Sequence, residues 1–210
     1  MARKTKEDAR ETRWKILLAA LDLFSEQGYT RTTFVDIARR IGMTKGAVYW
    51  HFEDKPRLLA AIIVEMHARE RALVADLVPA VYSLDDVKAY FVAQTRVVTE
   101  DERCRKFAFF MTLQMEWSVE LISIVHDLLM EVRGRPFQNV EEFLRLAKAR
   151  GELRPEVDIV VAKDILVGLW RGLLSNHFSG LSSCDLAETV NTAVGIYLES
   201  IRVNKELSVE

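Results

Sequence analysis

The stretch that most constrains the fold of this chain runs from Thr32 to Lys55 and reads TTFVDIARRIGMTKGAVYWHFEDK. Its first apolar residues have helical spacings of three, four and seven, which places them on one face of a helix: Phe34, Ile37, Ala38 and Ile41. Thr33 and Asp36 predict a capping pair at the start of this helix, and Gly42 supplies a left-handed residue at its end. Because Thr44 can cap a second short helix, the stretch predicts two helices joined by a tight turn.

The second helix has an unusual outer face. Val48 and Phe52, four residues apart, turn its apolar side inward. The outward positions are Lys45, Gly46, Tyr49, Trp50 and His51. Basic and aromatic side chains with almost no carboxylate suit DNA, where lysine reaches guanine or phosphate and aromatic rings press on sugar or thymine. Gly46 and Ala47 keep the entry into a major groove narrow, and Lys55 is placed for a further phosphate. A helical hairpin that uses the aromatic residues in a core or a protein interface would show the same periodicity.

Residues 12–56 resemble the DNA-binding domain of the TetR family of bacterial transcriptional regulators. The resemblance is carried by TKGAVYWHF, residues 44–52, followed by Asp54 and Lys55. The opening MARKTKEDARETR is similar to the AcrR-like branch, which represses multidrug efflux pumps. The resemblance implies a helix-turn-helix DNA-binding domain of three helices over residues 1–54. It also implies a helical ligand-binding and dimerisation domain over residues 55–210. The expected DNA contacts are Arg31, Thr32, Thr33, Thr44, Lys45, Gly46, Ala47, Tyr49, Trp50, His51 and Lys55.

Composition predicts an all-α protein of about nine helices. The 210 residues include only 4 Pro and 9 Gly, and no strand-like alternation is bounded by turn signals. Half of the residues are hydrophobic, which is enough for a substantial core. The longest apolar run, Leu58–Val64, is far too short to cross a membrane, and the N-terminus is charged instead of signal-like. We therefore expect a soluble, cytoplasmic protein.

Charge is unevenly spread along the chain. Residues 1–60 carry 12 Lys and Arg against 8 Asp and Glu, a balance of +4, whereas the rest of the chain has a balance of −6. A basic head on an acidic body fits a protein that presents one end to DNA. The basic arm over residues 1–9 has two interpretations of equal weight: a frayed tail, or a contact that becomes ordered on DNA.

The central helices carry the expected ligand pocket. Helices are predicted at 10–27, at 55–78, at 83–99 with a Ser83/Asp86 capping pair, and from Asp101 through Trp117. Aromatic and Met residues occur on almost every side of the last of these, so it is buried all round or lines a cavity. Core packing is the simpler explanation, but the resemblance implies an inducer pocket in this region. The expected pocket residues are His67, Phe107, Phe110, Met111, Gln114, Met115, Trp170 and His177. Glu116 could attract a cationic drug there, although a carboxylate at a helix end is usually solvated.

The C-terminal part predicts an interface between two copies of the chain. A long helical region over residues 118–150 should kink or break at Gly134–Pro136. Two further helices are expected at 158–178 and 185–204, and they have more apolar surface than one core needs. The resemblance implies that they pair with their copies in a four-helix bundle. The expected interface residues are Val161, Ile165, Leu173, Leu186, Val190, Val194, Tyr197 and Ile201.

No feature of the sequence predicts an enzyme. There is no nucleophile with a base at useful spacing and no phosphate-binding glycine loop. The four histidines have no paired ligand spacing, so neither a metal site nor a cofactor is expected. Cys104 and Cys184, 80 residues apart, are expected to be reduced and buried.

The sequence thus predicts a ligand-responsive repressor that binds a palindromic operator as a homodimer. A small hydrophobic or drug-like inducer would release it, and the resemblance implies control of an efflux pump operon. Two other classes remain open. A ligand-independent DNA-organising protein would need only the N-terminal head and would show steep salt dependence. A helical adaptor would use Tyr49 and Trp50 as anchors for a protein partner.

Overall fold

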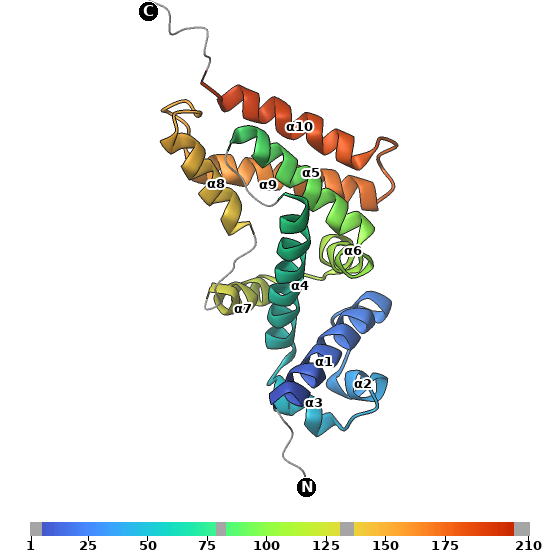
Figure 1. Ribbon diagram of the computed structural model, residues 1–210. Helices are drawn as coiled ribbons and strands as arrows, with labels where there is room; N and C mark the ends of the chain where they lie inside the picture. The colour runs from blue at the N-terminus through green and yellow to red at the C-terminus, as the bar shows by residue number, and fades with distance from the viewer. Residues whose placement is uncertain (1–5, 79–82, 131–136, 204–210) are drawn as a thin grey trace, which may run out of the picture. The chain divides into compact units, whose positions relative to one another are not determined.

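The computed structural model describes residues 6–78, 83–130 and 137–203 (Figure 1). In these ranges the regular structure consists of ten α-helices, one π-helical turn and a single isolated β-bridge between Leu153 and Arg202. The prediction of an all-α fold is confirmed. The described residues hold one α-helix more than the nine expected, because the region over residues 118–150 forms two helices. The break predicted at Gly134–Pro136 lies outside the described residues.

Contacts divide the chain into two compact units. Unit 1 comprises Met1–Ala68 and Lys106–Arg135, and unit 2 comprises Arg69–Arg105 and Pro136–Glu210. Helices α4 (Lys55–Leu77) and α6 (Glu102–Phe109) each contribute to both units. The functional boundary after residue 54 stays a prediction, since the compact units group residues by packing alone.

Three helices form the N-terminal part of unit 1: the long α1 (Lys6–Gln27) and the short α2 (Phe34–Arg40) and α3 (Lys45–His51). Helix α1 begins four residues before the predicted start at Arg10. Most of the predicted inward residues of α2 and α3 are buried, Ile37 and Val48 fully so, whereas Ile41 is half-buried. Helix α1 adds the fully buried Ile16, Ala20 and Phe24. Helices α1, α2 and α3 therefore share one small apolar core, as the sequence predicts.

The predicted caps fix where α2 and α3 begin. The Thr33 hydroxyl accepts a hydrogen bond from the backbone N–H of Asp36 (3.2 Å), and the Asp36 carboxylate accepts one from the N–H of Thr33 (2.9 Å). The Thr44 hydroxyl accepts a hydrogen bond from the N–H of Ala47 (3.2 Å). Between the two helices Gly42 has a φ of +67°, the left-handed conformation that glycine adopts without strain. Local sequence chemistry therefore defines the whole helix-turn-helix.

The remainder of unit 1 contains α6, the π-helical turn η1 (Phe110–Gln114) and α7 (Val119–Met130). One expectation is wrong here, because the helix that starts near Asp101 does not continue through Trp117. At η1 the N–H of Met115 donates to the carbonyl of Phe110 (2.9 Å), five residues back, and the helix stops. Phe110 is fully buried and stacks on Phe24 of α1 with 5.7 Å between ring centroids. Packing against α1 thus accompanies a widened last turn that spacing alone does not indicate.

Unit 2 is built from α5 (Leu84–Glu100), α8 (Gln138–Ala149), α9 (Ile159–Phe178), α10 (Leu186–Ile201) and the C-terminal part of α4. Figure 1 shows α10 lying alongside α5 and α9. The Ser83/Asp86 capping box at α5 is confirmed. Asp185 caps α10 by accepting from the N–H of Glu188 (2.7 Å), and α10 ends at Ile201 instead of Asn204. None of the described helices is long and apolar enough to span a membrane.

Candidate nucleic-acid interface and ligand contacts

The outer face of α3 exposes Lys45, Tyr49 and Trp50, as the spacing predicts, whereas His51 is half-buried. Val48 is fully buried on the inner face of α3, whereas 73% of the Trp50 surface is exposed. Tyr49 packs edge-on against the Phe34 ring at 4.8 Å between centroids, and the Trp50 and His51 rings meet at 4.6 Å. The ammonium of Lys45 lies 5.2 Å from the Tyr49 ring centroid. The helix therefore presents an aromatic and basic surface whose rings are held by neighbouring side chains.

The other predicted contact residues from the end of α1 to α3 differ in exposure and in the hydrogen bonds they already make. Thr33 and Thr44 are exposed, although each hydroxyl is already used as a helix cap. Gly46 is exposed, Ala47 is half-buried beside the Thr44 cap, and the exposed Arg31 donates from Nε to the carbonyl of Gln27 (2.6 Å). The structure brings the predicted residues from the end of α1 to α3 into one unit, and their contacts with DNA stay a prediction.

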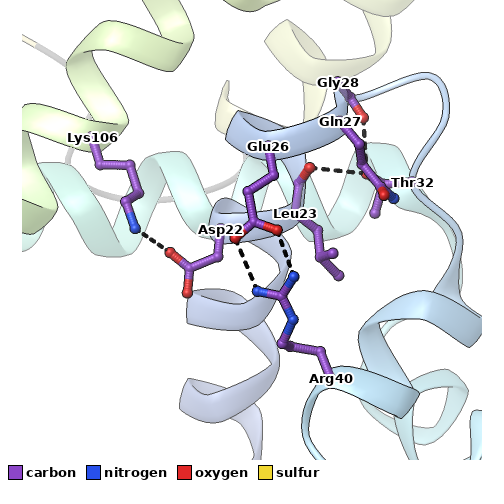
Figure 2. A network of polar contacts seen from close by, with 8 residues as sticks. All are labelled: Asp22, Leu23, Glu26, Gln27, Gly28, Thr32, Arg40 and Lys106. Atoms are coloured by element: carbon purple, nitrogen blue, oxygen red, sulfur yellow. Dashed lines mark hydrogen bonds and ion pairs between the residues drawn. The ribbon is translucent and has the colours of Figure 1, made fainter.

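One predicted contact residue is not available to DNA. Thr32 is fully buried, and its hydroxyl donates to the carbonyl of Gly28 (2.8 Å) while accepting from Nε2 of Gln27 (3.2 Å). These hydrogen bonds close the turn between α1 and α2 (Figure 2). The expectation that Thr32 touches DNA is therefore wrong: a polar residue in a turn was assumed to face outward, but the backbone of the turn takes up its hydroxyl.

Lys55 has a structural task that its position in the motif does not reveal. Its ammonium donates to the carbonyls of Tyr29 (2.9 Å) and Thr30 (3.0 Å) and lies 4.7 Å from the Tyr29 ring centroid. Burial lowers the pKa of Lys55, and burial followed by the nearby Asp54 carboxylate raises the pKa of Tyr29 to about 12. Two of the three N–H donors of the Lys55 ammonium are occupied, so at most one remains for the predicted phosphate contact.

Ion pairs join α1 to its neighbours in unit 1. Figure 2 shows Arg40 of α2 donating to the Glu26 carboxylate through two nitrogens, while the Lys106 ammonium donates to the Asp22 carboxylate. The hydrogen bond from Arg40 lowers the pKa of Glu26, and the same bond raises the pKa of Arg40. Helix α1 is thereby connected to α2 on one side and to α6 on the other.

The eight expected pocket residues fall into both units. Phe107 and Phe110 are buried in unit 1, where the His67 ring meets Phe107 edge-on at 5.5 Å between centroids. Gln114 donates from Nε2 to the carbonyl of Ser25 in α1 (3.1 Å). Met111 and Met115 are half-buried in the same unit, whereas Trp170 and His177 lie on α9 in unit 2. Trp170 is buried and His177 is exposed, so His177 does not line an enclosed cavity of its unit.

A buried polar cluster in unit 2 was not predicted. Nε1 of Trp170 donates to the Thr95 hydroxyl (2.9 Å), and Nε2 of Gln94 donates to the Glu70 carboxylate (3.2 Å). Glu70, Gln94 and Thr95 are almost completely buried. We call Glu70, Gln94, Thr95 and Trp170 the α5 polar cluster. Glu70 could have been noticed, because it interrupts the apolar stripe that runs along α4.

Two aromatic contacts adjoin this cluster on α5 and α9. The Tyr90 hydroxyl accepts from Nδ2 of Asn139 (2.8 Å), and burial raises the pKa of Tyr90. The Phe137 ring packs against Trp170 at 5.5 Å between centroids. The Arg171 guanidinium lies 5.3 Å from the centroid of the same Phe137 ring. Unit 2 thus places buried hydrogen-bonding groups among aromatic rings, which is the make-up of a small-molecule site.

Half of the expected interface residues are buried within the monomer, and their contact with a second copy stays a prediction. Leu186, Val190, Val194 and Ile201 are buried inside unit 2. Their side of α10 packs within the monomer, because an apolar stripe does not state whether it meets its own chain or a copy. By contrast, Val161 and Ile165 on α9 are 54% and 43% exposed, and Leu173 and Tyr197 are half-buried.

Cysteines and metal-binding groups add no further site. Cys104 is buried and, against expectation, Cys184 is exposed, and both are free thiols. Burial, followed by the hydrogen-bonded Asp101, raises the pKa of Cys104 well above its usual range, which disfavours the thiolate. Across residues 6–78, 83–130 and 137–203 no cluster of His, Cys, Asp or Glu could hold a metal ion.

Similarity to known proteins agrees with this geometry. Residues 16–62 match the family model described as "Bacterial regulatory proteins, tetR family". The chain is 32% identical over 203 residues to the HTH-type transcriptional regulator SrpR of Pseudomonas putida, covering 96% of this chain and 91% of SrpR. It is 30% identical over 201 residues to the HTH-type transcriptional regulator AcrR of Shigella flexneri, covering 95% and 93%.

A solved structure is similar over nearly the whole length. SmeT, the repressor of the Stenotrophomonas maltophilia multidrug efflux pump SmeDEF, has a TM-score of 0.70 and 28% identity, over 92% of this chain and 91% of that chain. The SmeT–triclosan complex has a TM-score of 0.74 and 29% identity, over 95% of each chain. Fold, family match and relatives together define a helix-turn-helix DNA-binding transcriptional regulator. The chain belongs to the tetR family of bacterial regulatory proteins and is similar to its AcrR-like members.

Proposed function

We propose that this protein is a repressor that binds a palindromic operator as a homodimer and leaves it when a small hydrophobic molecule binds. The observation that carries the proposal is the outer face of α3, where Lys45, Tyr49 and Trp50 are exposed beside a fully packed Val48. A two-fold dimer would set two such helices in successive major grooves, about 34–36 Å apart. Such a repressor would work in the cytoplasm, where bacterial DNA lies.

The dimer contact is proposed on the exposed face of α9. Val161, Ile165, Gly168 and Gly172 follow one another at spacings of four, three and four, so they share a stripe. A Cβ added at either glycine would meet no atom within 4 Å, which leaves room for the close approach of a second helix. Ile196 on α10 is 68% exposed and would extend this apolar surface.

The inducer site is proposed at the α5 polar cluster. Thr95, Gln94 and Glu70 supply hydrogen-bonding groups, and Trp170, Phe91 and Tyr90 supply aromatic walls. The SmeT–triclosan complex supports a ligand of aromatic, largely apolar character in a protein of this fold. Reducing occupancy of the DNA-competent state 100-fold requires the ligand to prefer the other state by only ~2.7 kcal/mol.

Control of an efflux pump operon is proposed from the relatives alone. SmeT represses a multidrug efflux pump, and the regulator is similar to it over nine-tenths of its length. An inducer that the pump exports would then raise the amount of the pump.

Footprinting on the DNA that flanks the protein's own gene tests the proposal. We expect a protected palindrome that withstands excess random duplex and disappears when triclosan or another hydrophobic drug is added. Protection that random duplex competes away, with no drug response, would favour a DNA-organising protein. The absence of any protection at low ionic strength would favour the protein-binding adaptor.

A further inference from the structure

Helix α8 begins differently from the other helices of unit 2. Its N-cap residue is Phe137, and no side chain caps the helix there, whereas hydroxyl or carboxylate side chains cap α5, α9 and α10. Phe137 has a φ of 59°, and no other non-glycine residue in the described parts of the chain has a positive φ. A large side chain is strained in this conformation, because its Cβ crowds the following carbonyl oxygen. Local chemistry therefore does not fix where α8 begins.

Contacts of the Phe137 ring hold this strained residue in place. The half-buried ring packs edge-on against Trp170 at 5.5 Å between centroids, and the Arg171 guanidinium lies 5.3 Å from its centroid. Both kinds of contact are attractive, since the edge of one ring and a cation each favour the electron-rich face of another ring. Backbone strain persists in a folded protein only where surrounding contacts offset it, and it concentrates at sites where a function uses it.

The two partners of the Phe137 ring belong to the surroundings of the α5 polar cluster. Nε1 of Trp170 donates to the Thr95 hydroxyl, so the indole that Phe137 contacts is itself a member of the cluster. Burial lowers the pKa of Arg171, and the Glu70 carboxylate opposes this shift, so the guanidinium lies within electrostatic reach of the cluster. An aromatic molecule that used Trp170 and Arg171 would need the position that the Phe137 ring already occupies.

We propose that Phe137 is an autoinhibitory residue of the inducer site, whose ring an aromatic inducer must displace from Trp170 and Arg171. This inference rests on the proposed function, because it takes the α5 polar cluster as the inducer site. Displacement costs two ring contacts, and the strain at Phe137 offsets part of that cost, so the ring is easily expelled. An aromatic inducer replaces the lost contacts, whereas an aliphatic molecule of the same size does not. Phe137 therefore selects for aromatic inducers.

A ¹⁹F NMR experiment on the full chain follows the ring directly. Labelling with 5-fluorotryptophan gives one signal for each of the four tryptophans, and the signal missing in Trp170→Phe belongs to Trp170. Wild type is compared with Phe137→Gly, since glycine adopts the left-handed conformation without strain. Without ligand, the Trp170 signals of the two proteins should differ, because the variant lacks the neighbouring ring. Saturation with triclosan should make the two signals coincide, because the wild-type ring has then left Trp170.

Two other results of this experiment would contradict the proposal in different ways. Trp170 signals that move with triclosan but keep their full difference at saturation would show that the ring stays in place. The inducer site would then stand and the autoinhibition would fall. A Trp170 signal that triclosan moves in neither protein would overturn the inducer site and the autoinhibition together. Neither result involves DNA, so operator binding is tested separately.

Triclosan affinity, measured by isothermal titration calorimetry, is the second readout. Phe137→Gly should bind about three- to tenfold more tightly than wild type, because no ring has to be displaced. Phe137→Tyr keeps the ring and should bind like wild type. Phe143→Ala removes another half-buried ring from α8 and should not tighten binding. Weaker binding by Phe137→Gly would make Phe137 an ordinary wall of the site, and an equal gain in Phe143→Ala would reduce the effect to a loosened helix; either result refutes the autoinhibition.

Discussion

Lys45 and Lys55 carry the same charge in the same motif, yet the structure surrounds them differently. Lys45 is exposed on α3, with the Tyr49 ring as its neighbour. Lys55 donates to two backbone carbonyls and holds the turn after α1 in place. A charged residue in a sequence is therefore a candidate contact only when the fold leaves its donors unused.

Replacing Lys45 with alanine should weaken operator binding by about 1–3 kcal/mol if it contacts a guanine, with no change in the thermal melt. The side chain is exposed and packs only along Tyr49, so the fold does not depend on it. Fluorescence anisotropy at several salt concentrations measures the effect. Lys88→Ala, which removes the same charge in unit 2, serves as the control. Equal affinities of Lys45→Ala and wild type would remove Lys45 from the interface.

Thr32→Val should destabilise the protein by about 1–2 kcal/mol, because valine keeps the shape but deprives the partly buried Gly28 carbonyl of its hydroxyl donor. Urea unfolding monitored by circular dichroism measures this loss. Thr192→Val, at an exposed position of α10, should change stability by less than about 0.5 kcal/mol. If Thr32→Val unfolded like wild type, the hydroxyl would have no structural role.

At the level of helices, two glycines of the helix-turn-helix should respond in opposite ways to alanine. Gly42 has a φ of +67°, so Gly42→Ala should cost about 1 kcal/mol although no atom lies within 4 Å of the added methyl group. Gly46 lies within α3 with ordinary dihedral angles, so Gly46→Ala should stabilise the protein by up to about 1 kcal/mol.

DNA binding should separate these two variants further. If backbone at Gly46 approaches the bases, Gly46→Ala should bind the operator more weakly although it is more stable. Thermal melts and anisotropy on the same samples measure both quantities. A Gly46→Ala protein with higher stability and undiminished operator affinity would show that the glycine is not needed for close approach.

The start of α6 depends on an ion pair that should make stability sensitive to acid. Arg69 of α4 binds Asp101 through two nitrogens, at 3.2 and 2.6 Å, and lowers the pKa of that carboxyl well below its usual range. A lowered folded-state pKa stabilises the fold above the unfolded pKa of about 3.9, and this contribution disappears as pH falls through the folded value.

Asp101→Asn should therefore lower the free energy of unfolding at pH 7 by about 1–2 kcal/mol. The gap between variant and wild type should narrow below about pH 4, because the unfolded wild-type chain takes up a proton at Asp101 that the folded protein still excludes. Urea unfolding of both proteins from pH 3 to pH 7 measures this difference in the free energy of unfolding. A gap that stays constant over this range would mean that the carboxylate charge contributes nothing.

At the level of the whole molecule, the proposed dimer makes a prediction about α9. Ile165→Glu should convert the protein to monomers at micromolar concentration, because it places a charge in an apolar contact. Val119→Glu, at an 87% exposed site on α7, makes a similar change and should leave the dimer intact. Sedimentation velocity measures both. Dimers of unchanged affinity in Ile165→Glu would move the interface away from this face.

The sequence by itself determined the helix-turn-helix, the caps of α2, α3 and α5, and the two faces of α3. These features are local: a cap needs a side chain within three residues of its N–H, and a helix face follows from periodicity within one element. The motif over residues 44–52 likewise indicated the family before any fold was known.

Tertiary structure alone decided which polar and apolar groups are available. Thr32, Glu70 and Lys55 are ordinary polar residues in the sequence, and only packing shows that the first two are buried and that the third holds two carbonyls. Val190 and Ile165 are both apolar residues on amphipathic helices, yet one is buried within unit 2 and the other is exposed. Burial is set by residues distant in the chain, so periodicity locates an apolar face but cannot name what covers it.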